Sequence, residues 1–271
     1  MGDEVLRDSA GVLHRPARDA RIVSLVPSIT ELLFDLGVGA RVVGRTGFCI
    51  HPAPAVRDVP KVGGTKDVRL DALRALAPTH VIVNVDENDA ATVDAMRSFV
   101  PHVVVTHPNA PEDNLRLFAL LGALFSAEAR AAALSAALLE ELGRCGATRW
   151  PRERVLYLIW KDPWMTVAAD TYIARTLACV GWDVTTPPGG WAGAARYPRV
   201  ADVVLAAADV DRVLLSTEPY LFTEREAAEL RGVTARPVEL IDAEMTSWYG
   251  SRAVRGLAYL RARRTASADR A

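Results

Sequence analysis

The sequence predicts an α/β protein of two lobes, each with a mainly parallel sheet, joined by a long backbone helix. Three observations lead to this fold class. Strands and helices alternate in both halves of the chain, the halves repeat the same order of elements, and an Ala/Leu-rich stretch of helical pattern separates them. Such alternation indicates a parallel sheet covered by helices. Two lobes imply a cleft, and clefts are where small molecules usually bind.

The first half opens with a short apolar strand at 22–26, followed by a helix that ends at Gly37. Ser28 and Glu31 form a capping-box signature at the start of this helix. Gly37 lies at the end of this helix, where a residue in the left-handed conformation commonly caps the C-terminus. The continuing alternation predicts strands at 42–43, 81–85 and 103–106, with helices around Asp71 and over 89–99.

The second half repeats this plan, with a strand at 155–159 and a helix from 170 that ends at Gly181. The stretch 201–208 leads into a strand at 212–216, as 70–78 leads into the strand at 80–84. Asp71 and Asp202 therefore occupy equivalent places in the repeat. A last helix is predicted over 251–264.

Between the halves, residues 111–145 have a helical pattern with a break near 122–126. The part from Ala127 onward is about 20 residues, hence about 30 Å if straight, which is enough to span two lobes. A rigid helical link disfavours large closure around a ligand. We expect an N-terminal arm (1–20), an N-terminal lobe (21–110), a helical linker (111–150) and a C-terminal lobe with a terminal helix (151–271).

Composition excludes several classes of protein. The formal net charge is −1 and no basic run is interleaved with aromatic residues, so we expect no nucleic-acid partner. No stretch of about 18 apolar residues exists, so no membrane span is predicted. The first residues lack the apolar core of a secretory signal, so the signal was removed or the protein stays inside. Three cysteines do not form a disulfide framework.

No set of nucleophile, base and orienting group occurs together, so we do not expect an enzyme or a catalytic cofactor. The informative residues are aromatic, in predicted loops after strands, where open α/β sheets bind ligands. They are Trp160, Trp164, Trp191, Trp248 and Tyr249. These side chains either stack on a ligand or fill contacts between the lobes, and the sequence leaves both interpretations open.

Cys49 and His51 lie two residues apart after a predicted strand, and together they could hold a metal or the metal centre of a ligand. No further ligand spacing completes a closed zinc site, so a structural role is the stronger interpretation. Asp86, Glu87 and Asn88 follow a strand and either contact a ligand or cap the next helix. Gly64 lies in a glycine pair that would let backbone approach a ligand.

Four segments resemble the helical-backbone substrate-binding proteins of ABC importers, and are most similar to the cobalamin-binding branch. They are RIVSLVPSITE (21–31), KVGG (61–64), LDALRALAP (70–78) and SWYGSR (247–252). The resemblance covers about 21–263. It implies two lobes that move little and hold cobalamin, haem or a ferric siderophore between them.

The resemblance also implies roles for individual residues. Asp71 and Asp202 would be the carboxylates that dock on the importer. The ligand-binding residues would be Pro27, Ser28, Phe48, Gly64, Trp160, Trp164, Trp191, Trp248, Tyr249 and Arg252. Cys49 and His51 remain metal candidates.

We therefore expect a monomeric solute-binding protein that captures a corrinoid or other metal chelate and delivers it to an ABC importer. By the resemblance it is periplasmic. The alternative is a cytoplasmic metal- or corrinoid-handling protein that uses Cys49 and His51 as ligands.

Overall fold

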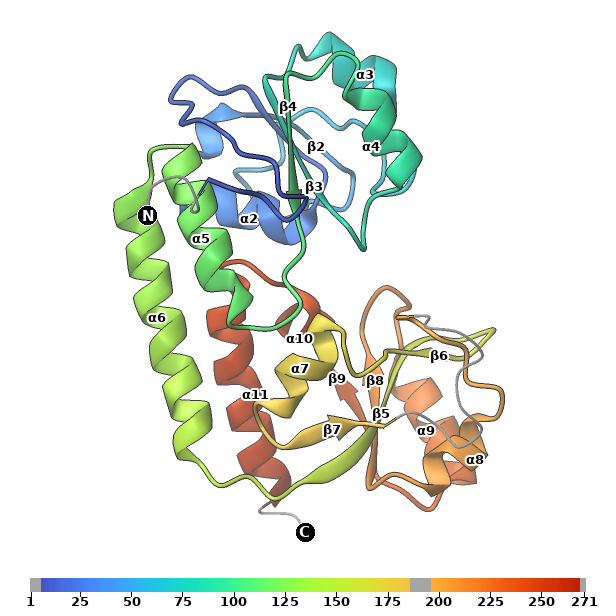
Figure 1. Cartoon of the computed structure of the whole chain (residues 1–271). Coiled ribbons are helices and arrows are strands. Elements are labelled where there is room, and N and C mark those ends of the chain that lie inside the picture. The colour runs from blue at the N-terminus through green and yellow to red at the C-terminus, as the bar shows by residue number, and fades with distance from the viewer. Residues whose placement is uncertain (1–5, 186–195, 269–271) are drawn as a thin grey trace. The chain divides into compact units, whose positions relative to one another are not determined.

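The computed structural model describes residues 6–185 and 196–268, and two compact units are distinguished within the chain (Figure 1). Unit 1 consists of Met1–Pro108, Glu112–Leu138 and Tyr249–Arg252. Unit 2 consists of Asn109–Pro111, Leu139–Trp248 and Ala253–Ala271. Trp191 lies outside the described residues, so its predicted role stays a prediction.

Unit 1 contains a four-stranded parallel sheet in the order β2-β1-β3-β4. Its strands are β1 (Ile22–Ser24), β2 (Val42–Arg45), β3 (His80–Asn84) and β4 (His102–Thr106). The inner strands are buried along their whole length, as expected of parallel strands covered on both faces. The predicted parallel sheet is confirmed.

The helices of unit 1 are α2 (Pro27–Asp35), α3 (Leu70–Ala75), α4 (Ala90–Met96) and α5 (Asp113–Leu124), with a 3₁₀ turn η1 (Gly39–Arg41). Leu73 of α3 and Met96 of α4 are fully buried against valines of β1, β3 and β4. Burial of such side chains contributes about 1.5–3 kcal/mol each. Gly37 has φ 76°, which confirms the predicted left-handed cap.

The predicted capping box at Ser28 and Glu31 is wrong. The residue before α2 is Val26, which has extended backbone and no capping side chain, and Pro27 takes the first helical position. Proline suits that position because its missing N–H has no partner there in any case. Ser28 is consequently inside the first turn, and the Glu31 carboxylate accepts hydrogen bonds from Arg252 instead.

Residues 7–13 form a hairpin in which Arg7 pairs with Leu13. This hairpin is joined to the edge strand β4, because Ser9 N–H donates to the Val105 carbonyl and Val105 N–H donates to the Asp8 carboxylate. The segment from residue 6 onward is therefore an ordered part of unit 1.

The break predicted near 122–126 is confirmed, because α5 ends at Leu124 and α6 spans Glu128–Ala147. Helix α6 is 20 residues long, as expected from the sequence. Ser126 between the two helices has φ 55°, a left-handed conformation that ends the first helix. The boundary between the two units falls within α6, between Leu138 and Leu139.

Unit 2 repeats the topology of unit 1, with one addition. Its strands are β5 (Glu153–Trp160), β6 (Met165–Thr166), β7 (Trp182–Val184), β8 (Arg212–Ser216) and β9 (Val238–Ile241). Strand β5 pairs in parallel with β7 and β8, and β8 pairs in parallel with β9. The order β7-β5-β8-β9 matches β2-β1-β3-β4, so the predicted repeat is confirmed. The addition is β6, which pairs antiparallel with the end of β5.

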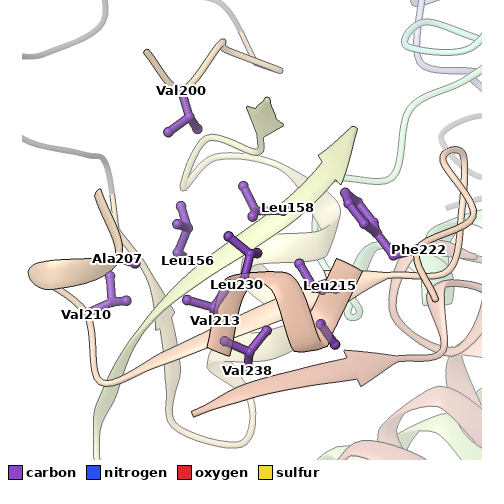
Figure 2. Packing of buried hydrophobic residues seen from close by; sticks show 11 residues of the cluster. Leu156, Leu158, Val200, Ala207, Val210, Val213, Leu215, Phe222, Leu230 and Val238 are labelled. Carbon is purple, nitrogen blue, oxygen red and sulfur yellow. The ribbon is translucent and has the colours of Figure 1, made fainter. Parts of the chain in front are cut away.

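The helices of unit 2 are α7 (Tyr172–Ala178), α8 (Val203–Ala208), α9 (Glu224–Val233), α10 (Ala243–Ser247) and α11 (Arg252–Ala268). Figure 2 shows one core of this unit, in which Leu156 and Leu158 of β5 and Leu215 of β8 pack with Phe222 and Leu230. Gly181 after α7 has φ 77°, so the second predicted glycine cap is also confirmed. Within the described residues, no helix is both long and apolar enough to cross a membrane.

Candidate functional site

In unit 1, three apolar side chains are exposed just after the carboxyl ends of parallel strands. Phe48 and Ile50 follow β2 and are 63% and 54% exposed, and Val85 follows β3 and is 53% exposed. Ligands of open α/β sheets bind at this end of the strands. Large apolar side chains that gather at such an edge indicate a surface that a ligand covers.

The polar loop after β3 is held by hydrogen bonds on several sides. The Asn88 amide group donates to the carbonyls of Leu25 and Thr65, at 3.3 and 2.9 Å. Lys66 Nζ donates to the Asp86 carbonyl at 2.9 Å. The cap of the next helix is Asp89, which accepts from Thr92 N–H. The loop is thus a fixed support for Val85.

Cys49 is fully buried and its Sγ lies 3.1 Å from the Thr46 hydroxyl. Burial raises the pKa of the Cys49 thiol, which favours the neutral form rather than the thiolate that binds metals. His51 is only partly buried, on the loop that follows. Among the residues described, no group of three or more His, Cys, Asp or Glu side chains is placed to hold a metal ion. The metal role of Cys49 and His51 stays a prediction.

The predicted backbone approach of a ligand at Gly64 stays a prediction. A Cβ on Gly64 would lie 2.1 Å from Asp67 Oδ1 and 3.4 Å from the Phe48 ring. Asp67 would have to turn aside to admit a side chain there, and the residue lies directly beside Phe48. Pro27 and Ser28 lie in the first turn of α2, after the carboxyl end of β1, where Ser28 is buried and Pro27 half-buried.

The segment Tyr249–Arg252 belongs to unit 1 and its predicted ligand residues have protein partners there. The Tyr249 hydroxyl donates to the Glu87 carboxylate. The Arg252 guanidinium donates two hydrogen bonds of 2.7 Å to the Glu31 carboxylate, and both side chains are buried. Buried bidentate pairs of this kind fix geometry as well as charge.

In unit 2, an aromatic cluster follows strands β5 and β8. Trp160 ends β5 and is 39% exposed, with the Tyr220 ring edge-on at 5.7 Å between centroids. Trp164 is stacked on Phe222 at 5.9 Å and is part of the core packing. Leu221, between the two aromatic residues, is 70% exposed. Trp160 and Leu221 therefore form the exposed part of the cluster.

Trp248 has a different environment, because it is only 8% exposed and its indole Nε1 donates to Glu218 Oε1 at 2.7 Å. Glu218 faces a hollow of about 410 Å³ beyond the ends of β8 and β9. The other residues that line it are Thr217, Leu221, Leu240, Ile241, Asp242 and Glu244. Burial raises the pKa of Glu218, and the charges of Glu244 and Asp242 raise it further despite the bond from Trp248.

The two predicted docking carboxylates lie near the starts of corresponding helices, but two positions apart relative to the first helical residue. Asp71 is the second residue of α3, and Asp202 directly precedes α8 and accepts a 2.9 Å hydrogen bond from Val204 N–H. Both residues are exposed. The structure thus leaves both carboxylates accessible, while their docking role stays a prediction.

Four residues of these surfaces were missed from the sequence: Ile50, Val85, Tyr220 and Leu221. Ile50 and Val85 read as ordinary apolar residues, although each follows a strand. Tyr220 and Leu221 follow β8 after Pro219, and their position after a strand was the one sequence signal that they could contact a ligand.

Comparisons with known proteins agree with this geometry. Residues 22–214 match the model of the family described as periplasmic binding protein. A vitamin B12-binding protein of Vibrio campbellii is 24% identical over 230 residues, which cover 83% of this chain and 78% of the relative. A second one, from Vibrio parahaemolyticus, is 23% identical over 219 residues, covering 80% and 74%.

Solved structures are also similar. The apo periplasmic haem-binding protein RhuT of Roseiflexus sp. has a TM-score of 0.72 at 22% identity, covering 91% of this chain and 98% of that one. The periplasmic vitamin B12-binding protein BtuF of Vibrio cholerae has a TM-score of 0.72 at 15% identity, covering 91% and 97%. At these identities the likeness shows a shared fold.

Proposed function

Since this chain belongs to the periplasmic binding protein family, we propose that it captures a metal chelate of the corrinoid class and delivers it to an ABC importer. The family consists of solute-binding transport proteins, so the chain is a solute-binding protein and not an enzyme. Cobalamin, haem and ferric siderophores are the chelates to compare, as transported ligands rather than catalytic cofactors.

The observation that carries the proposal is the exposure of large apolar side chains at the strand ends of each unit. Unit 1 presents Phe48, Ile50 and Val85, and unit 2 presents Trp160 and Leu221. A corrin or porphyrin offers a broad apolar face, and aromatic side chains contribute about 0.5–1.5 kcal/mol beyond area burial when they pack on another ring.

Among metal chelates, the charge of the unit 2 hollow favours a corrinoid. Glu218, Asp242 and Glu244 line it together with apolar Leu240. Carboxylates accept hydrogen bonds from the amide N–H groups at the periphery of a corrinoid. They repel the carboxylates of haem and the anionic groups of most siderophores, and like-charge contacts cost several kcal/mol.

Calorimetric titration of the purified chain with cyanocobalamin, hemin and a ferric siderophore tests this proposal. Cyanocobalamin should bind most tightly, and Trp160→Ala should weaken its binding about 5- to 100-fold, as loss of an aromatic anchor does. Leu139→Ala is the matched control, because Leu139 is an exposed apolar residue of α6 that is away from the strand ends. Tighter binding of hemin, or equal losses in both variants, would contradict the proposal.

Cys49 and His51 are not required for this function. Their direct test is the metal content and cyanocobalamin affinity of Cys49→Ser and His51→Ala. The proposal expects both to be unchanged, because Cys49 is enclosed in the core of unit 1.

The remaining parts of the proposal follow from the family. Its members are periplasmic, and we place this chain in the same compartment. Its partner is the membrane part of an ABC importer, which Asp71 and Asp202 would contact as exposed carboxylates near the starts of corresponding helices, α3 and α8. The chain would act as a monomer.

A further inference from the structure

Besides the hollow of unit 2, the structure has a cavity in unit 1, which the proposed capture of a chelate does not use. It has a volume of about 130 Å³ and is bordered by the N-terminal hairpin, the end of β4 and helix α5. Its floor is apolar, made by the buried residues Leu117 and Leu120 of α5. On this measure one water molecule needs about 10–15 Å³, so the cavity has room for a small solute but not for a metal chelate.

Two guanidinium groups from separate elements line this cavity, Arg7 on the hairpin and Arg116 on α5. Arg7 Nη1 donates to the Gly11 carbonyl at 2.6 Å, and Arg116 Nη2 donates to the Arg7 carbonyl at 3.4 Å. Among the described residues, 6–185 and 196–268, each guanidinium makes this one hydrogen bond and takes part in no ion pair. Each therefore retains N–H donors directed to solvent or to the cavity.

The charge of the lining is positive. Asp113 is the one carboxylate among the residues that border the cavity, against two guanidinium groups. The imidazole of His107 borders the same space and lies 3.5 Å from Asp86. Both arginines are exposed, and two guanidinium groups beside one cavity attract an anion, more strongly where an apolar floor lowers the local dielectric.

From these contacts we infer that the cavity is a binding site for one small oxyanion, held by Arg7 and Arg116. A guanidinium matches two oxygens of a phosphate or a carboxylate at once, which a lysine does not. The oxyanion would join the hairpin to α5, so its binding stabilises unit 1 without occupying the exposed apolar surface at Phe48 and Val85.

Thermal unfolding in phosphate, sulfate or acetate tests this site, with chloride at the same ionic strength as the reference. The expected result is a saturable rise in Tm of about 2 °C or more, since a ligand that binds only the folded state stabilises it. Arg116→Gln and Arg7→Gln should each weaken the binding at least about tenfold, and Arg116→Lys should weaken it less.

Arg97→Gln is the matched control, because Arg97 is an exposed arginine directly after α4, outside the cavity, and its variant should keep the saturable response. Saturation by phosphate and sulfate alone identifies a tetrahedral oxyanion, and saturation by acetate identifies a carboxylate. Linear rises in Tm that are parallel in wild type and all variants would overturn the inference, since they report general salt exclusion. Cyanocobalamin affinity in the same variants separates this site from the proposed function.

Discussion

Acid should destabilise unit 1 through a buried histidine that is kept neutral. His80 of β3 is almost fully buried, and its ring is stacked on that of His102 of β4 at 4.6 Å between centroids. The two are register partners in the parallel ladder, and His14 of the hairpin lies edge-on to His102 at 6.4 Å. Burial, together with the charges of His102 and His14, lowers the pKa of His80 to about 4.

The sign and size of the effect follow from the difference between the two states. The pKa of an unfolded histidine is about 6.5, so between pH 6.5 and 4 the unfolded chain binds more protons than the folded one. Stability therefore falls as the pH falls through this window. For a native pKa of about 4 the loss is about 2 kcal/mol at pH 5 and about 3 kcal/mol at pH 4.

Asp8 does not interfere in this window. Burial acts to raise its pKa, but hydrogen bonds from His14, Val105 and Val12 outweigh burial and lower the pKa below the usual 3.8. A carboxylate with a lowered pKa contributes stability above its unfolded pKa and loses it only in stronger acid. The loss between pH 6.5 and 5 is thus assigned to histidine.

Urea unfolding from pH 7.5 to 4.5 measures this dependence. His80→Gln removes the titrating group, so the curve of unfolding free energy against pH should be flatter by about 2 kcal/mol at pH 5. His102→Gln removes the neighbouring charge and should raise the native pKa of His80, so the loss should be smaller and should level off at a higher pH. His51→Gln, in a loop of the same unit, is the control. Parallel curves for wild type and His80→Gln would refute the reasoning.

Three further predictions concern the remaining buried pairs and the exposed carboxylates. Arg252→Met should lower the free energy of unfolding by about 3–5 kcal/mol, because the Glu31 carboxylate is left buried without its ion pair. In the same urea assay, the double variant Glu31→Leu/Arg252→Leu should recover much of this loss, because no buried charge is left unpaired. Trp248→Phe should cost about 1–3 kcal/mol through the lost indole hydrogen bond, and an unchanged Tm would contradict that assignment. Asp71→Lys/Asp202→Lys should weaken association with the importer in a salt-dependent way while ligand affinity stays constant, and normal association would remove the docking role.

The fold was predictable because its strands are covered on both faces and read as continuous apolar runs. The runs at 81–83 and 213–215, with glycine caps after two helices, were enough to identify the repeat. Strand β6 was not predicted. It has two residues, Met165 and Thr166, and it forms because the chain reverses direction after β5 and pairs antiparallel with the end of that strand. A two-residue strand has no periodicity to detect.

Glu31 illustrates why local patterns fail at a site. The spacing of Ser28 and Glu31 satisfies the capping-box rule, yet the carboxylate is held by Arg252, which lies 221 residues further along the chain. Local spacing carries no information about such a partner. Pro27 was the contrary local signal, since a proline at the first helical position moves the helix start one residue ahead of the serine.

Trp160 and Trp248 show what the structure adds to a prediction that treated them alike. Both are loop-proximal tryptophans in the sequence, but the Trp160 ring is exposed over Tyr220, whereas Trp248 is enclosed and bonded to Glu218. Truncation of Trp160, which is 39% exposed, removes area that a ligand would cover as well as its contact with Tyr220, so the Tm should fall less than in the corresponding Trp248 variant. Truncation of Trp248 opens a cavity and removes a hydrogen bond in the folded protein, at a cost of about 3–5 kcal/mol. A loss of affinity in Trp248→Ala therefore does not by itself support ligand stacking, because the same variant should also have a lower Tm.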